Sequence, residues 1–249
     1  MKTVILCGGR GTRLNRQGAL VPKALFRIGD DPLILHLCRI YKHFGLNEFE
    51  LCLGFLAEEF GRFFGQSILQ PGQLGETIPG RIAESEGVAV QLIETGVDTN
   101  TGGRIKMLEE RLQGEQTFCV TYGDGLADID VRRLLEFHRG HGKIATLTAV
   151  NPMSNFGLID LNDDNSVARF REKPKLKEWI NGGFFVFNRK IFDYLQDDSV
   201  LERKPFEGLA TDGQLMAYRH DGFWKCMDTF KDNVELNDIW NSGAPWKVW

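Results

Sequence analysis

The sequence predicts an α/β fold with a mostly parallel sheet, helices on both faces and a smaller antiparallel region. Apolar runs alternate with amphipathic segments up to residue 150, which is typical of a covered parallel sheet. Beyond residue 150 the apolar runs follow one another closely, which favours mixed or antiparallel pairing. Several glycine-containing loops also begin where a predicted strand ends, where open parallel sheets bind their ligands. We expect one domain over residues 1–249.

In the first part, five apolar runs predict strands and four amphipathic segments predict helices. The helix predicted over 32–45 shows the pattern, because Leu33, Leu37, Ile40 and Phe44 recur at helical spacing. The predicted strands are 3–8, 49–55, 88–95, 117–124 and 144–150, and the predicted helices are 32–45, 57–69, 102–112 and 131–142.

In the second part, strands are expected at 156–161, 166–173, 182–188 and within 215–229, and a helix over 231–243. Residues 70–87 contain Pro71, Pro79 and four glycines, and form the clearest long loop. Such a loop is a candidate for a mobile lid or an interface, or it is an ordinary surface connection.

The composition is that of a soluble globular protein, with 42% hydrophobic and 26% charged residues. The net charge of −4 gives no global basic field, so we expect no nucleic acid partner. We expect no membrane partner either, because no apolar run is long enough to span a bilayer. The five cysteines form no Cys-x-x-Cys pair, and the N-terminus has no signal-peptide pattern. Free thiols in the cytoplasm are therefore the expected case.

The loop after the first strand combines glycines with positive charge. Gly8, Gly9 and Gly11 allow a tight turn and close approach of the backbone to a ligand, and Arg10 and Arg13 add fixed charge. This combination suits a polyphosphate. No Gly-Lys-Ser/Thr closes the loop, and Leu14 replaces the third glycine of a dinucleotide fingerprint, so a dehydrogenase is weakly supported. Alone, a short glycine motif favours an ordinary strand-to-helix turn, and the two arginines shift this balance only modestly.

Two further loops follow predicted strands. Residues 95–104 contain Thr99, the pair Gly102 and Gly103, and the donor fork of Arg104. The glycine pair permits close backbone approach at a helix N-terminus, which favours anions or a base edge.

Carboxylates at two strand ends could hold a metal. Asp124 lies between Gly123 and Gly125, and Asp228 precedes a predicted helix, where it could equally be an N-cap. If paired in space, Asp124 and Asp228 would form a two-carboxylate Mg²⁺ site. The adjacent Glu172 and Lys173, taken alone, are a solvated pair at a strand end.

Seven short motifs occur in one order along nearly the whole chain. They are Gly-Gly-x-Gly-Thr-Arg-Leu, Pro22-Lys23, Thr-Gly-Gly-Arg, Tyr-Gly-Asp-Gly, Phe-x-Glu-Lys-Pro, Asn-Gly-Gly-Phe-Phe and Met-Asp-Thr. In this the chain resembles the sugar-1-phosphate nucleotidyltransferase family, and more closely its glucose-1-phosphate cytidylyltransferase branch. The resemblance implies a Rossmann-like fold, with residues 1–150 mainly nucleotide-binding and residues 151–249 mainly acceptor-binding.

The resemblance implies that CTP reacts with a sugar 1-phosphate to form a CDP-sugar and pyrophosphate. The sugar 1-phosphate that it favours is glucose 1-phosphate, and Mg²⁺ is the cofactor. The catalytic residues would be Arg13, Lys23, Asp124 and Asp228, the last two as metal ligands. Glu172, Lys173 and Asn181 would bind the acceptor. The nucleotide would contact Leu6, Cys7, Gly8, Gly9, Gly11, Thr12, Arg13, Lys23, Thr99, Gly102, Gly103, Arg104 and Gly123.

The chain departs from the branch pattern mainly on the acceptor side. Val21 replaces a lysine, and Lys204 stands where a sugar-contacting carboxylate is expected. Another sugar phosphate or another small phosphorylated acceptor is therefore an alternative, and so is a catalytically weak nucleotide-binding homologue. The resemblance also implies a homo-oligomer.

Overall fold

A computed structural model describes residues 1–10, 21–73, 86–154 and 156–249. Its main sheet holds nine strands among these residues. They are β1 (Thr3–Leu6), β4 (Glu48–Leu53), β5 (Ile68–Leu69), β6 (Ala89–Glu94), β7 (Thr117–Tyr122), β9 (Ala145–Val150), β12 (Ile180–Asn181), β13 (Phe185–Asn188) and β14 (Leu215–His220).

The order of strands across the sheet is β12-β9-β13-β7-β1-β4-β6-β5, with β14 paired to β9. The pairs β1–β4, β1–β7, β4–β6, β5–β6 and β9–β14 are parallel, whereas β13 runs antiparallel to both β7 and β9. The prediction of a mostly parallel mixed sheet is therefore confirmed. The second half of the chain adds strands to the same sheet.

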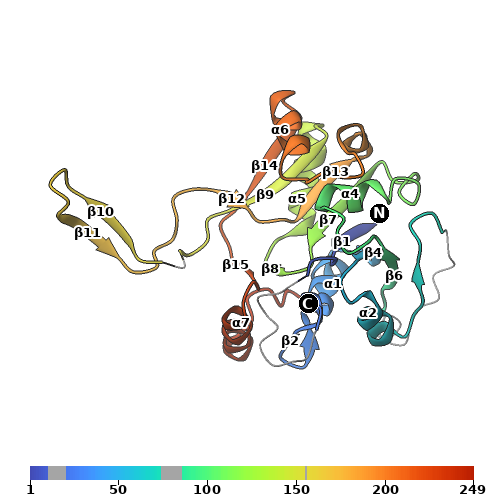
Figure 1. Ribbon diagram of the computed structural model, residues 1–249, viewed down its shortest axis with the longest axis horizontal. Helices are drawn as coiled ribbons and strands as arrows, with labels where there is room; N and C mark the ends of the chain where they lie inside the picture. Colours follow the sequence, from blue (N-terminus) through green and yellow to red (C-terminus); the bar gives the residue numbers. More distant parts are fainter. Residues whose placement is uncertain (11–20, 74–85, 155) are drawn as a thin grey trace.

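Helices cover both faces of the sheet (Figure 1). Alternation along β1 shows the two cores, because Val4 and Leu6 pack into one and Ile5 into the other. The core around α1 also buries Trp246, and the other core lies under α4 and α6. The helices are η1 (Lys23–Leu25), α1 (Leu33–His43), α2 (Ala57–Phe64), α4 (Thr101–Lys106), α5 (Val131–His141), η2 (Arg189–Tyr194), α6 (Lys204–Thr211) and α7 (Phe230–Ser242).

Two predicted helix boundaries were wrong, and one helix was not predicted. The helix predicted over 57–69 ends at Phe64, because Gly65 takes a left-handed conformation (φ 66°) and the chain then enters β5. The helix predicted over 102–112 is regular only to Lys106 and continues as turns. Helix α6 was not predicted, although Pro205 in its first turn is a start signal.

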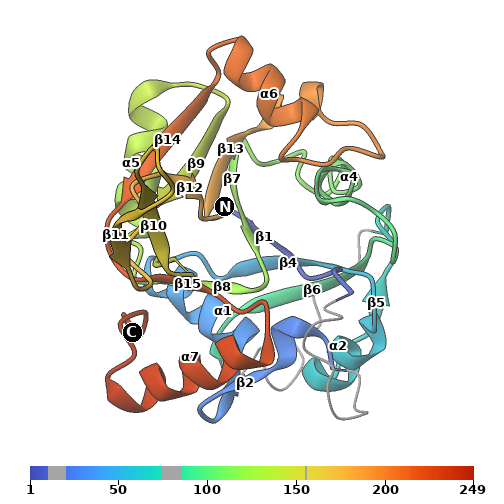
Figure 2. The same cartoon turned by 60° about the vertical axis from the view of Figure 1, so that its left-hand side comes forward.

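Three small antiparallel pairs complete the fold, and two of them matter below. The β10–β11 hairpin projects from the rest of the molecule, while β8 and β15 pair beneath the main sheet (Figures 1 and 2). No helix among the described residues is long and apolar enough to cross a membrane. The pairs are β2 (Arg27–Ile28) with β3 (Asp31–Pro32), β8 (Gly125–Ala127) with β15 (Trp224–Cys226), and β10 (Leu158–Leu161) with β11 (Val167–Arg171).

Candidate active site

The carboxyl ends of three parallel strands are joined by one buried guanidinium. Arg104, in α4, donates from Nη1 to Leu53 O (2.8 Å) and Thr95 Oγ1 (2.6 Å). Its Nη2 donates to Gly8 O (3.2 Å). Burial lowers the pKa of Arg104, and nearby acidic groups oppose this effect. Arg104 thereby fixes the loops after β1, β4 and β6, and its contact with nucleotide stays a prediction.

The loop after β1 packs closely against its surroundings. Cys7 is buried, and burial raises the pKa of its thiol well above the ordinary value. The amide of Gly123 donates to Leu6 O (3.0 Å), and a Cβ at Gly123 would lie 2.9 Å from Cys7 Sγ. Gly9 is exposed. Cys7 therefore fills a tight turn in this structure. The predicted nucleotide ligands Gly11, Thr12 and Arg13 lie outside the described residues.

Gly102 and Gly103 are required by packing at the start of α4. A Cβ at Gly103 would lie 2.1 Å from Asp197 O, and one at Gly102 would lie 2.8 Å from Ser199 Cβ. The Gly103 amide donates to Ser199 O (3.0 Å). The structure thus assigns both glycines to contact with the segment before α6, and a contact with the base edge stays a prediction. Thr99 is half-buried in the preceding loop.

Lys23 lies between the two predicted metal carboxylates. Its Nζ donates to Asp124 Oδ2 (2.9 Å) and to Asp228 Oδ1 (2.7 Å). Burial, the largest single influence, lowers the pKa of Lys23, but the two carboxylates together outweigh it and raise that pKa. Lys23 is therefore charged at neutral pH. The structure brings these three residues together, and their catalytic and metal-binding roles stay predictions.

Strand pairing explains why Asp124 and Asp228 meet. In the β8–β15 pair Gly125 lies opposite Cys226, and Met227 N donates to Asp124 O (2.8 Å). The two aspartates therefore leave neighbouring strand ends. Both side chains are partly exposed.

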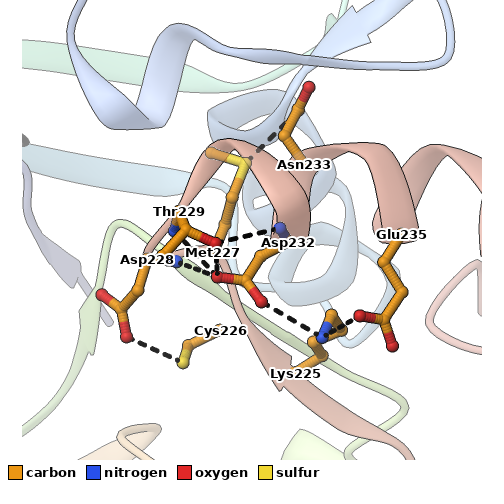
Figure 3. Close-up of polar contacts among 8 residues, drawn as sticks. All are labelled: Lys225, Cys226, Met227, Asp228, Thr229, Asp232, Asn233 and Glu235. Atoms are coloured by element: carbon orange, nitrogen blue, oxygen red, sulfur yellow. Dashed lines mark hydrogen bonds and ion pairs between the residues drawn. The ribbon is translucent and has the colours of Figure 1, made fainter. Parts of the chain in front are cut away.

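The start of α7 holds the backbone of Asp228 (Figure 3). Asp232 Oδ2 accepts hydrogen bonds from the amides of Asp228 (3.1 Å) and Thr229 (2.8 Å). Thr229 caps the helix in return, so the two form a capping box. The carboxylate of Asp228 also has a contact here, because Cys226 Sγ lies 3.3 Å from Asp228 Oδ2. Asp228 is therefore not the N-cap that the sequence left open as an alternative, because Thr229 takes that role.

A second polar network lies beside α4. Asn181 Nδ2 donates to Tyr122 Oη (3.1 Å), and the Tyr122 hydroxyl donates to Glu202 Oε1. Glu202 Oε2 accepts from Thr101 Oγ1 (2.8 Å). Tyr122 is two residues before Asp124, so this network borders the carboxylate pair. The sequence prediction included Asn181 but missed Glu202, because only the fold brings residue 202 to this strand end.

Glu172 and Lys173 directly follow β11, at the base of the projecting hairpin. Both are exposed, and Lys173 Nζ lies 3.9 Å from Glu172 Oε1. Their predicted contact with the acceptor therefore stays a prediction. Lys204 is exposed in the first turn of α6.

The model of the nucleotidyl transferase family matches residues 2–233. The chain belongs to the nucleotidyl transferase family. A Bacillus subtilis (strain 168) protein named "Probable glucose-1-phosphate cytidylyltransferase" is 41% identical, and the match covers 100% of both chains. The glucose-1-phosphate cytidylyltransferase of Salmonella typhimurium is 38% identical, again over 100% of both.

Solved structures show the same fold at lower identity. The crystal structure of HddC from Yersinia pseudotuberculosis has a TM-score of 0.70 and 21% identity, with 96% of this chain and 98% of that chain covered. The family match and the full-length relatives show that the chain is a nucleotidyltransferase. Its fold is Rossmann-like, as the resemblance implied.

The residues of this nucleotidyltransferase fit a Mg²⁺ ion. Two carboxylates converge on one ammonium, so a divalent cation beside them would find anionic oxygen ligands. Both are partly exposed, which leaves room for water and phosphate oxygens. No group of three or more His, Cys, Asp or Glu side chains arranged for a metal occurs among the described residues. A pair of carboxylates is what Mg²⁺ typically takes from protein when phosphates supply the rest.

Proposed function

We propose that this nucleotidyltransferase converts CTP and glucose 1-phosphate into CDP-glucose and pyrophosphate. The observation that carries the proposal is the bridge from Lys23 to Asp124 and Asp228 at the carboxyl ends of the parallel strands. The choice of CTP and of glucose 1-phosphate is supported by two full-length relatives that carry that name at 38% and 41% identity.

In the proposed reaction, an oxygen of the sugar phosphate attacks the α-phosphorus of CTP. The new oxygen–phosphorus bond forms as the bond to the bridging oxygen breaks, and pyrophosphate carries away the electron pair. No covalent intermediate with the protein is required, so alignment and charge neutralisation supply the rate enhancement. Arg13 and Lys23 would neutralise phosphate charge. The positive charge of Lys23 and its hydrogen bonds to both carboxylates support this role.

Asp124 and Asp228 would hold Mg²⁺, which supplies charge neutralisation at the phosphate oxygens when bound. The Arg104 tie would keep the loop after β1 in position for the triphosphate. This loop and α4 belong to the first half of the chain, which we assign to the nucleotide. We assign the second half, residues 151–249, mainly to the acceptor.

We assign Asn181 and Glu202 to the hydroxyls of the acceptor sugar. Both side chains converge on Tyr122, beside the carboxylate pair. Glu202 carries the carboxylate that the sequence pattern placed at Lys204. A negative side chain repels the acceptor phosphate, so the sugar ring would face Glu202 and the phosphate would face Lys23.

A turnover panel tests the proposal. The purified protein is incubated with Mg²⁺, each common nucleoside triphosphate and a set of sugar 1-phosphates, and pyrophosphate release is measured. Release with CTP and glucose 1-phosphate supports the proposal. Release with CTP and another acceptor would change the acceptor assignment alone, whereas preference for another triphosphate would overturn the cytidylyl assignment. If no pair releases pyrophosphate but CTP binds, the chain is a nucleotide-binding homologue.

A further inference from the structure

The ammonium of Lys23 fills the place between the two carboxylates that the proposed cation needs. Its Nζ lies 2.9 Å from Asp124 Oδ2 and 2.7 Å from Asp228 Oδ1. Figure 3 shows that the other oxygen of Asp228, Oδ2, faces the thiol of Cys226, 3.3 Å away. The oxygen that Asp228 contributes to the pair with Asp124 is therefore the one that Lys23 contacts.

This place cannot hold the ammonium and a divalent cation together. A Mg²⁺ ion binds carboxylate oxygens at about 2.0–2.1 Å. A cation shared by the same two oxygens would therefore overlap the space that Nζ fills, and the two positive charges would repel each other. The side chain of Lys23 is only 19% exposed, so water and salt screen this repulsion little. Lys23 and a divalent cation thus compete for one anionic position.

Lys23 can leave this position without a change of the backbone. Its backbone lies in the short helix η1, and the next residue, Ala24, is buried. The Cβ of Ala24 is 3.6 Å from where a Cβ at Gly123, the neighbour of Asp124, would lie. The helix and this strand end are therefore packed together, whereas the ammonium is carried by a flexible four-carbon stem. Rotation about the side-chain bonds withdraws it while both carboxylates stay in place.

We propose that Lys23 fills the cation position of the nucleotide-free enzyme and leaves it when a nucleoside triphosphate binds. Phosphate oxygens then take over the ammonium, and both carboxylates become accessible to the divalent cation. Cation and triphosphate consequently bind cooperatively, and by linkage each strengthens the binding of the other by the same factor. The inference rests on the proposed function, because it takes Asp124 and Asp228 as the metal ligands.

The chemistry of a lysine suits such an exchange of partners. An ammonium is a point charge with rotatable donors, whereas a guanidinium is a rigid fork that fits two oxygens in one plane. Carboxylate and phosphate oxygens are therefore interchangeable partners for Lys23. Before the exchange, the same ammonium neutralises two carboxylates that would otherwise repel each other. Lys23 thus has a role both before and after the nucleotide binds.

Binding of Mn²⁺ in the absence of nucleotide tests the exchange. Mn²⁺ suits the same oxygen ligands as Mg²⁺, and electron paramagnetic resonance measures its free concentration. Lys23→Met removes the ammonium and keeps an unbranched side chain. Lys231→Met is the matched control, because it removes the same charge from the exposed side of α7. A double variant, Lys23→Met with Asp228→Asn, locates the bound ion, and far-UV circular dichroism checks the fold of each variant.

We expect Lys23→Met to bind Mn²⁺ at least about tenfold more tightly than the wild type. The reason is that no ammonium then has to give up two hydrogen bonds to charged groups. Lys231→Met should bind Mn²⁺ as the wild type does, and the double variant should lose the gain. Equal affinity of Lys23→Met and the wild type would overturn the proposal. So would an equal gain in Lys231→Met, or a gain that persists in the double variant.

The binding test and the turnover panel fail separately. Unchanged Mn²⁺ affinity in Lys23→Met overturns the exchange, but it leaves pyrophosphate release from CTP and glucose 1-phosphate as a valid test of the reaction. If the wild type releases no pyrophosphate, the proposed reaction is overturned. Tighter Mn²⁺ binding by Lys23→Met, lost with Asp228→Asn, still shows that Lys23 competes with a cation at this carboxylate.

Discussion

The guanidinium of Arg104 lies directly against Gly8, so that a Cβ added at Gly8 would be only 2.0 Å from Nη1. Gly8 is therefore glycine because of this contact. The same guanidinium contacts the loop ends at Leu53 and Thr95. One side chain thus couples the conformation of the first glycine loop to two other strand ends.

We expect Gly8→Ala to destabilise the protein by about 2 kcal/mol or more, because the methyl group displaces Arg104 and leaves buried carbonyls without donors. Gly9→Ala is the matched control, since nothing lies within 4 Å of a Cβ at Gly9. The free energy of unfolding from urea titration measures both. Equal stability of the two variants would show that Arg104 adapts without cost.

Lys23 should be essential for turnover in the proposed reaction. Lys23→Ala removes the ammonium from between Asp124 and Asp228, and we expect kcat to fall by roughly 10²–10³-fold. Lys231→Ala, on the exposed side of α7, should leave kcat unchanged. Steady-state pyrophosphate release measures both. A Lys23→Ala variant with wild-type kcat would show that the lysine only neutralises the negative charge of the two carboxylates.

The capping box of α7 should influence the Mg²⁺ requirement. Thr229→Ala removes the helix cap and frees the segment that carries Asp228, so we expect a loss of about 1 kcal/mol in stability. The Mg²⁺ concentration for half-maximal activity should also rise. Asp130→Ala is the control, because it removes the N-cap of α5, a helix that does not hold the segment of Asp228. This control should lose similar stability at an unchanged Mg²⁺ requirement, and identical Mg²⁺ titrations for both variants would contradict the expectation.

Variants at Glu202 and Lys204 test which of the two positions contacts the sugar. The structure supports Glu202, whereas the sequence pattern expects the contact at position 204. Both side chains are exposed, but Glu202 contacts Tyr122 and Thr101. We expect Glu202→Ala to raise KM for the sugar phosphate at least about tenfold, with KM for CTP little changed, because a hydroxyl partner is lost. Lys204→Ala should leave both KM values near wild type. The assignment fails if the lysine variant is the one that changes KM for the sugar phosphate.

The sequence predicted much of the fold because its periodicity is local. Alternating apolar runs and helical spacing predicted the order of strands and helices along the chain, and glycine-rich loops indicated where strands end. Helix α6 and the short strand β5 were missed, because both are short and become regular only through contacts with the sheet.

The site was predictable where a motif sits directly at a strand end, as for Asp124. The meeting of Asp124 with Asp228 depends on the β8–β15 register, which no local pattern contains. Likewise, Gly102 and Gly103 looked like ligand-facing glycines, but their nearest neighbours are Asp197 and Ser199 from a distant segment. Glu202 was missed for the same reason.

Stability should fall in mild acid because of His138. This side chain is buried, and burial lowers its pKa from 6.5 to about 4. The unfolded chain binds a proton near the ordinary pKa, whereas the folded chain does not until about pH 4. Stability from this group is therefore complete above about pH 6.5 and is lost as the pH falls toward 4. The loss amounts to on the order of 3 kcal/mol.

His138 shares the hydroxyl of Thr146 with a second histidine. His138 Nδ1 lies 2.8 Å and His141 Nε2 lies 2.7 Å from Thr146 Oγ1. One ring must accept the hydroxyl proton, so protonation of both rings would break the arrangement. His138→Gln should therefore flatten the dependence of the free energy of unfolding on pH between 7.5 and 4.5, measured by urea titration. His43→Gln, at an exposed ring, should keep the wild-type slope. If both variants retain that slope, other groups carry the acid sensitivity.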